Sequence, residues 1–306
     1  MTVNIKERFK NYIEKRQRNK SHNTFRRSIN RSTGGDIGIY VLLGIVGVIM
    51  AAPLYFAIIQ SLKPLDEFWF FPPRFYVVNP TMKNFKDLFR LMGDSWVPFS
   101  RYIFNTVFIS TVGTTGHVLF ASYAAYAIAK IAFPGRKFLF SIVIYSLMFN
   151  ATVTGITNFI TMALLGWVDT YLAVIVPAFC TTFGLYLMKQ FMETNVTDAV
   201  LESARIEGAN ENKIFWKIAM PMVKPAWVTL VIFSFRDLWN MGGNLFIYSE
   251  QLKTFNYAIG QLVTSGIARS GVGAAATVVM MVVPVTVFVI AQSNVIQTMS
   301  TSGMKD

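Results

Sequence analysis

Residues 102–129 read YIFNTVFISTVGTTGHVLFASYAAYAIA, and no acidic, lysine or arginine side chain interrupts them between Arg101 and Lys130. A helix crosses the hydrocarbon core of a bilayer with about 20 mainly apolar residues. The stretch exceeds that length, so it predicts a membrane-spanning helix. Its length and its lack of apolar–polar alternation argue against a strand of an outer-membrane barrel.

Five more stretches along the chain have the same character. They cover approximately residues 37–62, 138–165, 170–190, 223–248 and 274–297, and the run that starts near Val223 is interrupted by Arg236-Asp237 before it continues to about Tyr248. The alternative, buried helices of a large soluble protein, would leave a chain of 306 residues almost no water-facing surface. We therefore predict an all-α, polytopic membrane protein with six transmembrane helices.

The composition supports the same class. Hydrophobic residues make up 53% of the chain and charged residues 14%, and the mean hydropathy is +0.44. A soluble domain carries about 25% charged residues. The single cysteine, Cys180, lies inside the fourth stretch, so the chain can form neither an internal disulfide nor a cysteine-based metal site.

The basic residues predict the orientation. The first 35 residues contain ten lysines and arginines against two acids. Such residues concentrate on the cytoplasmic side of membrane proteins. We therefore expect residues 1–34 to form a basic cytoplasmic tail, and with six spans the C-terminus is cytoplasmic too. The loop 63–101 is an exception, with six basic residues and four acids, but long loops weigh less in this rule.

The net charge of +12 could suggest a nucleic-acid partner. The orientation of a plasma-membrane protein explains it more simply, so we expect no nucleic acid. Contact of the basic tail with anionic lipid is an open alternative.

One polar segment between the fourth and fifth stretches is informative. Residues 201–221 read LESARIEGANENKIFWKIAMP, which predicts a helix over about 198–212, a turn, and a return to the membrane. Thr197 can cap this helix, and Asp198 suits the positive end of its dipole. Gly208 is expected to end the helix in a left-handed conformation.

This segment resembles the cytoplasmic EAA loop of ABC-importer permeases. That loop reads Glu-Ala-Ala, three residues, Gly, nine residues and Ile-x-Leu-Pro. The matching positions here keep the family's spacing throughout, and the departures are Ser203 for alanine and Met220 for leucine. The matched residues are Glu202, Ser203, Ala204, Gly208, Ile218 and Pro221.

The resemblance extends from about residue 35 to residue 306 and favours the carbohydrate-uptake branch, similar to the smaller permease of the maltose importer. Three stretches carry it: residues 166–177, Trp239-Asn240 and the ending 292–306. It implies that residues 198–212 form a coupling helix that rests in a groove of an ATPase subunit.

The implied partners are a second, homologous permease, two copies of a cytoplasmic ATPase subunit, an extracellular binding lipoprotein and a sugar. The chain has no phosphate-binding loop of the form Gly-x-x-x-x-Gly-Lys-Ser/Thr, so we expect ATP to bind elsewhere. We expect no catalytic residue, metal or cofactor in this chain.

Polar residues inside predicted spans are candidates for a translocation path, because such groups are costly in a membrane and often functional. The alternative for each is a hydrogen bond between helices or to the partner permease. His117 is expected to be a satisfied buried histidine rather than a metal ligand. The path candidates are Arg236, Asp237, Asn240, Asn105, Asn150 and Asn158.

Other functions remain as alternatives. A permease of the same type could import a solute other than a sugar. An ion-coupled secondary transporter would be expected to show inverted repeats and membrane carboxylates. The sequence shows no repeat and one clear membrane acid, Asp237. A membrane enzyme would need a cluster of catalytic groups, which two distant histidines do not make.

Overall fold

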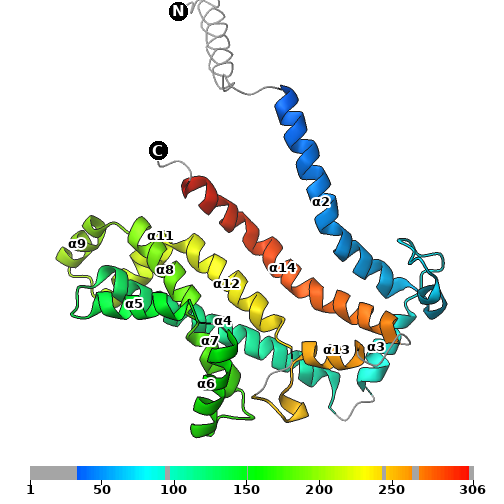
Figure 1. Cartoon of the computed structure of the whole chain (residues 1–306). Coiled ribbons are helices and arrows are strands. Elements are labelled where there is room, and N and C mark those ends of the chain that lie inside the picture. The colour runs from blue at the N-terminus through cyan, green and yellow to red at the C-terminus, as the bar shows by residue number, and fades with distance from the viewer. Residues whose placement is uncertain (1–32, 94–96, 150, 243–245, 264–268, 303–306) are drawn as a thin grey trace, which may run out of the picture. The chain divides into compact units, whose positions relative to one another are not determined.

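Helices form every regular element in the part of the chain that the structure describes (Figure 1). The computed structural model describes residues 33–93, 97–149, 151–242, 246–263 and 269–302. It divides into two units, Met1–Phe56 and Ala57–Asp306. The all-α prediction is confirmed for these residues. The predicted tail lies outside them except for its last two residues, and so do Asn150 and residues 303–306.

Helix α2, Thr33–Leu62, matches the first predicted span. Its apolar side chains are exposed along the helix, including Val48 at 72% and Met50 at 74%. A helix that is apolar on every side and still exposed is suited to lipid. By length and composition, Gly34–Leu62 can cross a membrane, as the sequence predicts.

Helix α4, Phe99–Lys130, matches the second predicted span and is the central helix of the second unit. It packs against α7 (Leu172–Phe179), α8 (Thr182–Asn195) and α12 (Lys224–Trp239). Gly184 of α8 permits this approach, because a Cβ there would overlap the His117 ring and Leu230. Small residues at such crossings let membrane helices approach closely.

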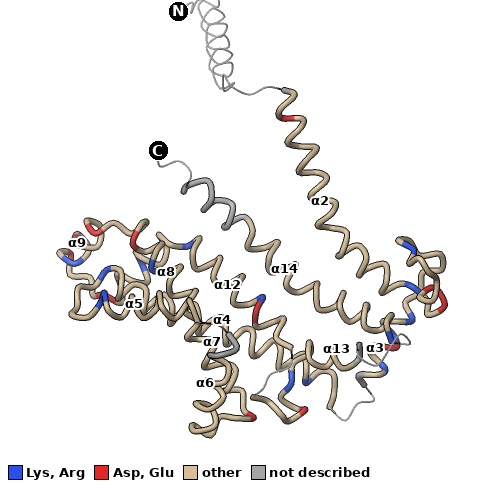
Figure 2. The backbone as a smooth tube through the Cα atoms, in the orientation of Figure 1, with Lys and Arg blue, Asp and Glu red and all other residues tan. Residues whose placement is uncertain are grey.

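The last predicted span is helix α14, Ser270–Ser302. It packs along α12 and against two shorter helices, α3 (Lys83–Gly93) and α13 (Phe255–Val263). Its buried contacts are made by small residues such as Ala275 and Ala276. Figure 2 shows no charged residue along the described part of α14, as expected for a membrane helix.

The third predicted span, 138–165, is not one helix. It is divided into α5 (Arg136–Ser146) and α6 (Ala151–Leu164). After α5 the backbone tightens to i→i−3 hydrogen bonds, from the amides of Met148 and Phe149 to the carbonyls of Tyr145 and Ser146. Such a tightened turn ends an α-helix.

The fifth predicted span, 223–248, is shorter than expected because α12 ends at Trp239. It is preceded by α10 (Glu211–Ile214), a π-helical turn (Phe215–Ala219) and α11 (Met220–Met222). The axes of Glu211–Met222 and Lys224–Trp239 differ by 82°. Pro225 lies at the bend and lacks the amide that would bond back to the carbonyl of residue 221.

The described residues therefore contain four helices that are long and apolar enough to cross a membrane, or five when the bent pair is one span. The fourth predicted span, 170–190, is confirmed as one of these, with α7 and α8 together covering Leu172–Asn195. The count of six spans stays a prediction.

Candidate functional site

Helix α9, Asp198–Ile206, carries the segment that the sequence singled out. It is shorter than the predicted 198–212, because the chain turns at Gly208 with φ +81°. The Gly208 amide donates to the Arg205 carbonyl and the Ala209 amide to the Ala204 carbonyl, both at 3.0 Å. These two bonds make a Schellman motif, which requires a left-handed residue. The predicted role of Gly208 in ending the helix is confirmed.

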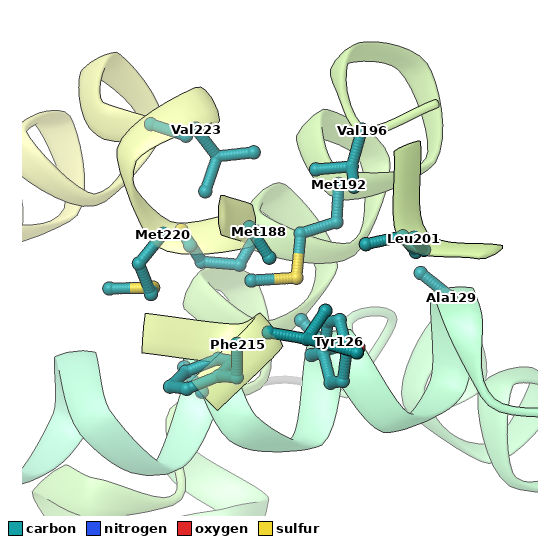
Figure 3. Packing of buried hydrophobic residues seen from close by; sticks show 14 of the residues in the cluster. Tyr126, Ala129, Met188, Met192, Val196, Leu201, Phe215, Met220 and Val223 are labelled. Atoms are coloured by element: carbon teal, nitrogen blue, oxygen red, sulfur yellow. The ribbon is translucent and has the colours of Figure 1, made fainter. Parts of the chain in front are cut away.

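One face of α9 packs onto the rest of the chain. Leu201 is 1% exposed and Ala204 is 8% exposed. Both belong to an apolar cluster that includes Tyr126 and Ala129 of α4 and Met192 of α8 (Figure 3). Ala204 therefore has an internal reason to be small, since a larger side chain would have to displace this cluster.

The opposite face of α9 is open. Glu202 and Ser203 are exposed, and the Ser203 hydroxyl donates to the Ala199 carbonyl at 2.9 Å. Ile206, at the end of the helix, is 87% exposed. The sequence interpretation missed Ile206, although an isoleucine on the polar face of a short amphipathic helix is a visible signal.

The remaining two residues of the motif lie beyond the turn. Ile218 is half-buried in the π-helical turn and packs against the same apolar cluster. Pro221 is exposed in α11, before the 82° bend. Neither contributes to the open face of α9. They belong to the connection that leads from α9 into α12.

Two ion pairs join α9 to neighbouring parts of the chain. Lys130 donates to Asp198 at 2.8 Å and lowers the pKa of that carboxyl through the hydrogen bond and its charge. Arg205 donates to Glu211 at 2.7 Å, and this bond raises the pKa of the guanidinium. The Arg205 hydrogen bond is also the main cause that lowers the pKa of Glu211, so this contact favours the charged form of both partners.

A second feature is a cavity of about 340 Å³ between α4, α7, α8 and α12. Most of its lining is apolar, and Asp237 of α12 contributes a carboxylate to it. Asp237 and its neighbour Arg236 are both exposed and pair at 3.3 Å. The structure thus brings one predicted path residue to a cavity inside the bundle.

His117 also borders this cavity but is itself 2% exposed. Its Nδ1 lies 3.2 Å from the Phe179 carbonyl oxygen. A carbonyl only accepts, so Nδ1 carries the proton in this contact. The prediction of a satisfied buried histidine is confirmed.

The three asparagine candidates that the structure describes do not gather at one place, and Asn150 lies outside the described residues. Asn105 is fully buried and bonds to Gln251, Lys253 and Tyr171. These bonds join separate elements of the chain, so they support a structural role for Asn105 rather than a place in the path. Asn240 caps the C-terminus of α12 and is exposed, while Asn158 is exposed on α6.

In the stretch 166–177, Asp169 links the turn before α7 to residues 248–249. Asp169 has φ +60°, and its carboxylate accepts bonds from the Tyr248 and Ser249 amides at 2.9 and 2.8 Å and from the Ser249 hydroxyl. The Ser249 side chain is the main cause of its lowered pKa. The link is present at neutral pH and is lost only as the pH falls through that lowered value.

Comparison with known proteins decides the family. No family model matches the chain. Protein LplC of Bacillus subtilis is 32% identical over 210 residues, which are 67% of this chain and 67% of LplC. The arabinooligosaccharides transport system permease protein AraQ of Halalkalibacterium halodurans is 28% identical over 268 residues, 85% of this chain and 93% of AraQ. The chain belongs to the permease subunits of ABC importers.

Two further likenesses fit this ABC permease. The sn-glycerol-3-phosphate transport system permease protein UgpE of Yersinia enterocolitica is 29% identical over 216 residues, 69% of this chain and 75% of UgpE. A chain of a bacterial ABC transporter involved in the import of the acidic polysaccharide alginate has the same fold. It matches with a TM-score of 0.74 at 22% identity, over 87% of this chain and 99% of that chain. An ABC permease is a transport subunit and not an enzyme.

Proposed function

We propose that this ABC permease imports a sugar or oligosaccharide that an extracellular binding lipoprotein delivers. A second, homologous permease completes the path, and two copies of a cytoplasmic ATPase subunit drive it. The similarity to AraQ, whose name gives arabinooligosaccharides as its cargo, supports the sugar class. The similarity to UgpE keeps a non-sugar solute as the alternative that an experiment must decide.

The two-faced geometry of α9 is the observation that carries this proposal. Leu201 and Ala204 hold the helix on the membrane domain, while Glu202, Ser203 and Ile206 face outward. An exposed isoleucine on an otherwise polar surface is suited to insertion into an apolar groove of a partner. We assign that partner as the ATPase, and α9 as the coupling helix.

The path is proposed to run along α12 past Asp237 and Arg236. A carboxylate and a guanidinium can both bond to sugar hydroxyls, and Asp237 already borders the cavity beside α4 and α8. Six crossings, with both termini in the cytoplasm, place α9 on the ATPase side of the bacterial plasma membrane. The broken segment α5–α6 then counts as the third crossing.

Co-purification tests the assignment of α9. We expect Ile206→Asp to reduce retention of the ATPase subunit on the purified membrane complex, because a charge cannot be buried in an apolar groove without cost. Ile206→Leu is the matched control, since it keeps the apolar bulk, and it should retain the ATPase. Equal retention in the two variants would contradict docking through this face.

The solute is tested through the binding lipoprotein. If the solute is a sugar, we expect mass spectrometry to identify a mono- or oligosaccharide bound to the purified lipoprotein. A bound phosphate ester or peptide would contradict the sugar proposal and support the non-sugar alternative.

A further inference from the structure

The segment between α2 and α3 displays a group of exposed aromatic rings. Five aromatic side chains within residues 69–76 are exposed, and the Phe71 side chain is 94% exposed. Clusters of exposed apolar side chains mark contacts with a protein, a ligand or a membrane. We call these five side chains the aromatic tip: Trp69, Phe70, Phe71, Phe75 and Tyr76.

Two buried charged groups hold this segment in its conformation. Lys63 is 1% exposed, and its Nζ donates to the Arg74 carbonyl at 2.5 Å. Glu67 is also buried, and its carboxylate accepts bonds from the amides of Val78 and Asn79 at 3.2 and 2.9 Å. These bonds join residues before the aromatic tip to residues within and after it. The rings are therefore displayed by a structured loop.

The base of the segment is joined to the end of α2. The Thr81 amide donates to the Leu62 carbonyl at 2.9 Å. The side-chain amide of Asn84, in α3, donates to the carbonyls of Ser61 and Lys63 at 2.9 and 2.7 Å. The level of the aromatic tip in a membrane is therefore set by the end of α2.

The length of α2 places that end in a headgroup layer. Residues 37–62 contain no charged side chain. At 1.5 Å per residue they are about 39 Å long, compared with about 30 Å for the hydrocarbon core and about 40–45 Å with the headgroups. When Asp36 lies in the headgroup layer on one side, Leu62 lies in the layer on the other side. The aromatic tip follows Leu62 closely and is held next to that layer.

The chemistry of the segment suits a headgroup layer. Tryptophan and tyrosine are enriched where membrane meets water, because their rings are apolar and each carries a polar group that water can satisfy. The Arg74 guanidinium lies 4.7 Å from the centre of the Phe70 ring and provides a cation that can bind a lipid phosphate. Exposed apolar side chains also continue from Ile58 at the end of α2 to Leu65 and the tip.

The position of the segment agrees with a contact to lipid. Figure 1 shows it at one side of the second unit, next to the end of α2 and apart from α8 and α12, which border the cavity. A segment placed in this way does not line the cavity. It continues the surface through which the end of α2 meets the membrane.

We propose that the aromatic tip lies in the headgroup layer of the outer leaflet, with Phe71 inserted among the acyl chains and Arg74 beside a lipid phosphate. The tip thereby anchors the outer end of α2 at the membrane surface. The alternatives are that the second permease or the binding lipoprotein covers the tip. Only the choice of the outer leaflet depends on the proposed topology, and the contact with lipid does not depend on the proposed import of a sugar.

The accessibility of a nitroxide spin label tests the position of the tip. Cys180→Ser removes the native cysteine, and the complete importer with a label at Phe71→Cys is placed in nanodiscs of phosphatidylcholine and phosphatidylglycerol. Oxygen concentrates in lipid and a nickel chelate in water, so we expect the label to collide more often with oxygen. A label at Asn79→Cys, exposed but outside the tip, is the matched control and should collide more often with the chelate.

Three results would overturn the proposal. A Phe71 label that collides more often with the chelate would place the tip in water. A label shielded from both reagents in the importer would place the tip against the second permease. Accessibility to the chelate that is lost only when the loaded binding lipoprotein is added would assign the tip to that protein.

Removal of a ring tests whether the aromatic side chains seat the tip. Trp69→Ser, with the label at Phe71, should favour lifting of the tip from the lipid by about tenfold or more, because one buried ring is lost. Collisions of the label with the chelate should therefore increase, and folding should be kept because Trp69 is exposed. Tyr248→Ser is the matched control, since that ring is exposed but lies outside the segment.

Equal changes in the two variants, or no change in either, would contradict seating through the rings. None of these collision measurements requires ATP hydrolysis or sugar uptake. Failure of the lipid contact would therefore leave the proposed import function standing, and failure of that function would leave the lipid contact testable.

Discussion

A substitution series at Gly208 tests the coupling role of α9 most cleanly, because a side chain there would meet backbone strain but no steric overlap. The φ of +81° at Gly208 is unfavourable for residues with a Cβ, but no atom lies within 4 Å of where that Cβ would stand. Alanine therefore costs about 1–2 kcal/mol of backbone strain and nothing from overlap. Asparagine tolerates this conformation better, and valine, being β-branched, tolerates it least.

The consequence for the site follows from the two hydrogen bonds of the turn. A residue that escapes to negative φ gives up the Gly208–Arg205 and Ala209–Ala204 bonds, each worth about 0.5–1.5 kcal/mol. The released turn also redirects Glu211, which holds Arg205. We therefore expect defects that increase in the order Gly208→Asn, Gly208→Ala, Gly208→Val.

The assay separates coupling from insertion. Because α9 lies outside the membrane spans, all three variants should reach the membrane in near-normal amount. Alanine should shift the equilibrium of the docked helix by about fivefold or more, and valine should abolish stimulation of ATP hydrolysis by the loaded binding protein. Normal stimulation and uptake in the valine variant, or equal defects in asparagine and valine, would refute the reasoning.

The remaining predictions concern topology, the path and helix packing. A cysteine at Asn79 should react with an impermeant reagent from outside intact cells, and one at Asn210 should not. Arg236→Ala and Asp237→Ala should each lower uptake several-fold while the complex still assembles, because the exposed pair borders the proposed path. Gly184→Val should destabilise the bundle by about 1–3 kcal/mol or more, since overpacking displaces neighbours. The amount of complex that survives in detergent should therefore fall.

Each of these has its own control. Labelling at Asn210 with protection at Asn79 would reverse the orientation. Loss of assembly in the Arg236 and Asp237 variants would assign the pair to structure instead of the path. Gly155→Val is the matched control for Gly184, because no atom lies within 4 Å of its Cβ position in α6. Equal stability of the two glycine variants would contradict the packing argument.

Features that depend on residues close together in the sequence could be predicted from it. The charge-free stretches gave α2, α4 and α14 because the bilayer alone determines their length and polarity. The end of α9 was readable because only glycine accepts the left-handed turn cheaply. The likeness of residues 201–221 to the EAA loop predicted the family that the comparisons show.

Features that depend on distant partners were not readable. Asn105 was a path candidate because a buried asparagine and a path asparagine look alike in sequence, and its partners lie as far as 148 residues away. The break between α5 and α6 has no glycine or proline at residues 146–149 to announce it. The Tyr126–Glu211–Arg205 contact joins segments that only the folded chain brings together.

Reconstituted uptake tests the central claim most directly. The chain is placed in proteoliposomes with its partner permease, the ATPase subunits and the loaded binding lipoprotein, and entry of a labelled sugar is measured. The account predicts uptake that requires ATP and all four components, and none from this chain alone under a proton gradient. Uptake by the chain alone, driven by the proton gradient without ATP, would contradict it.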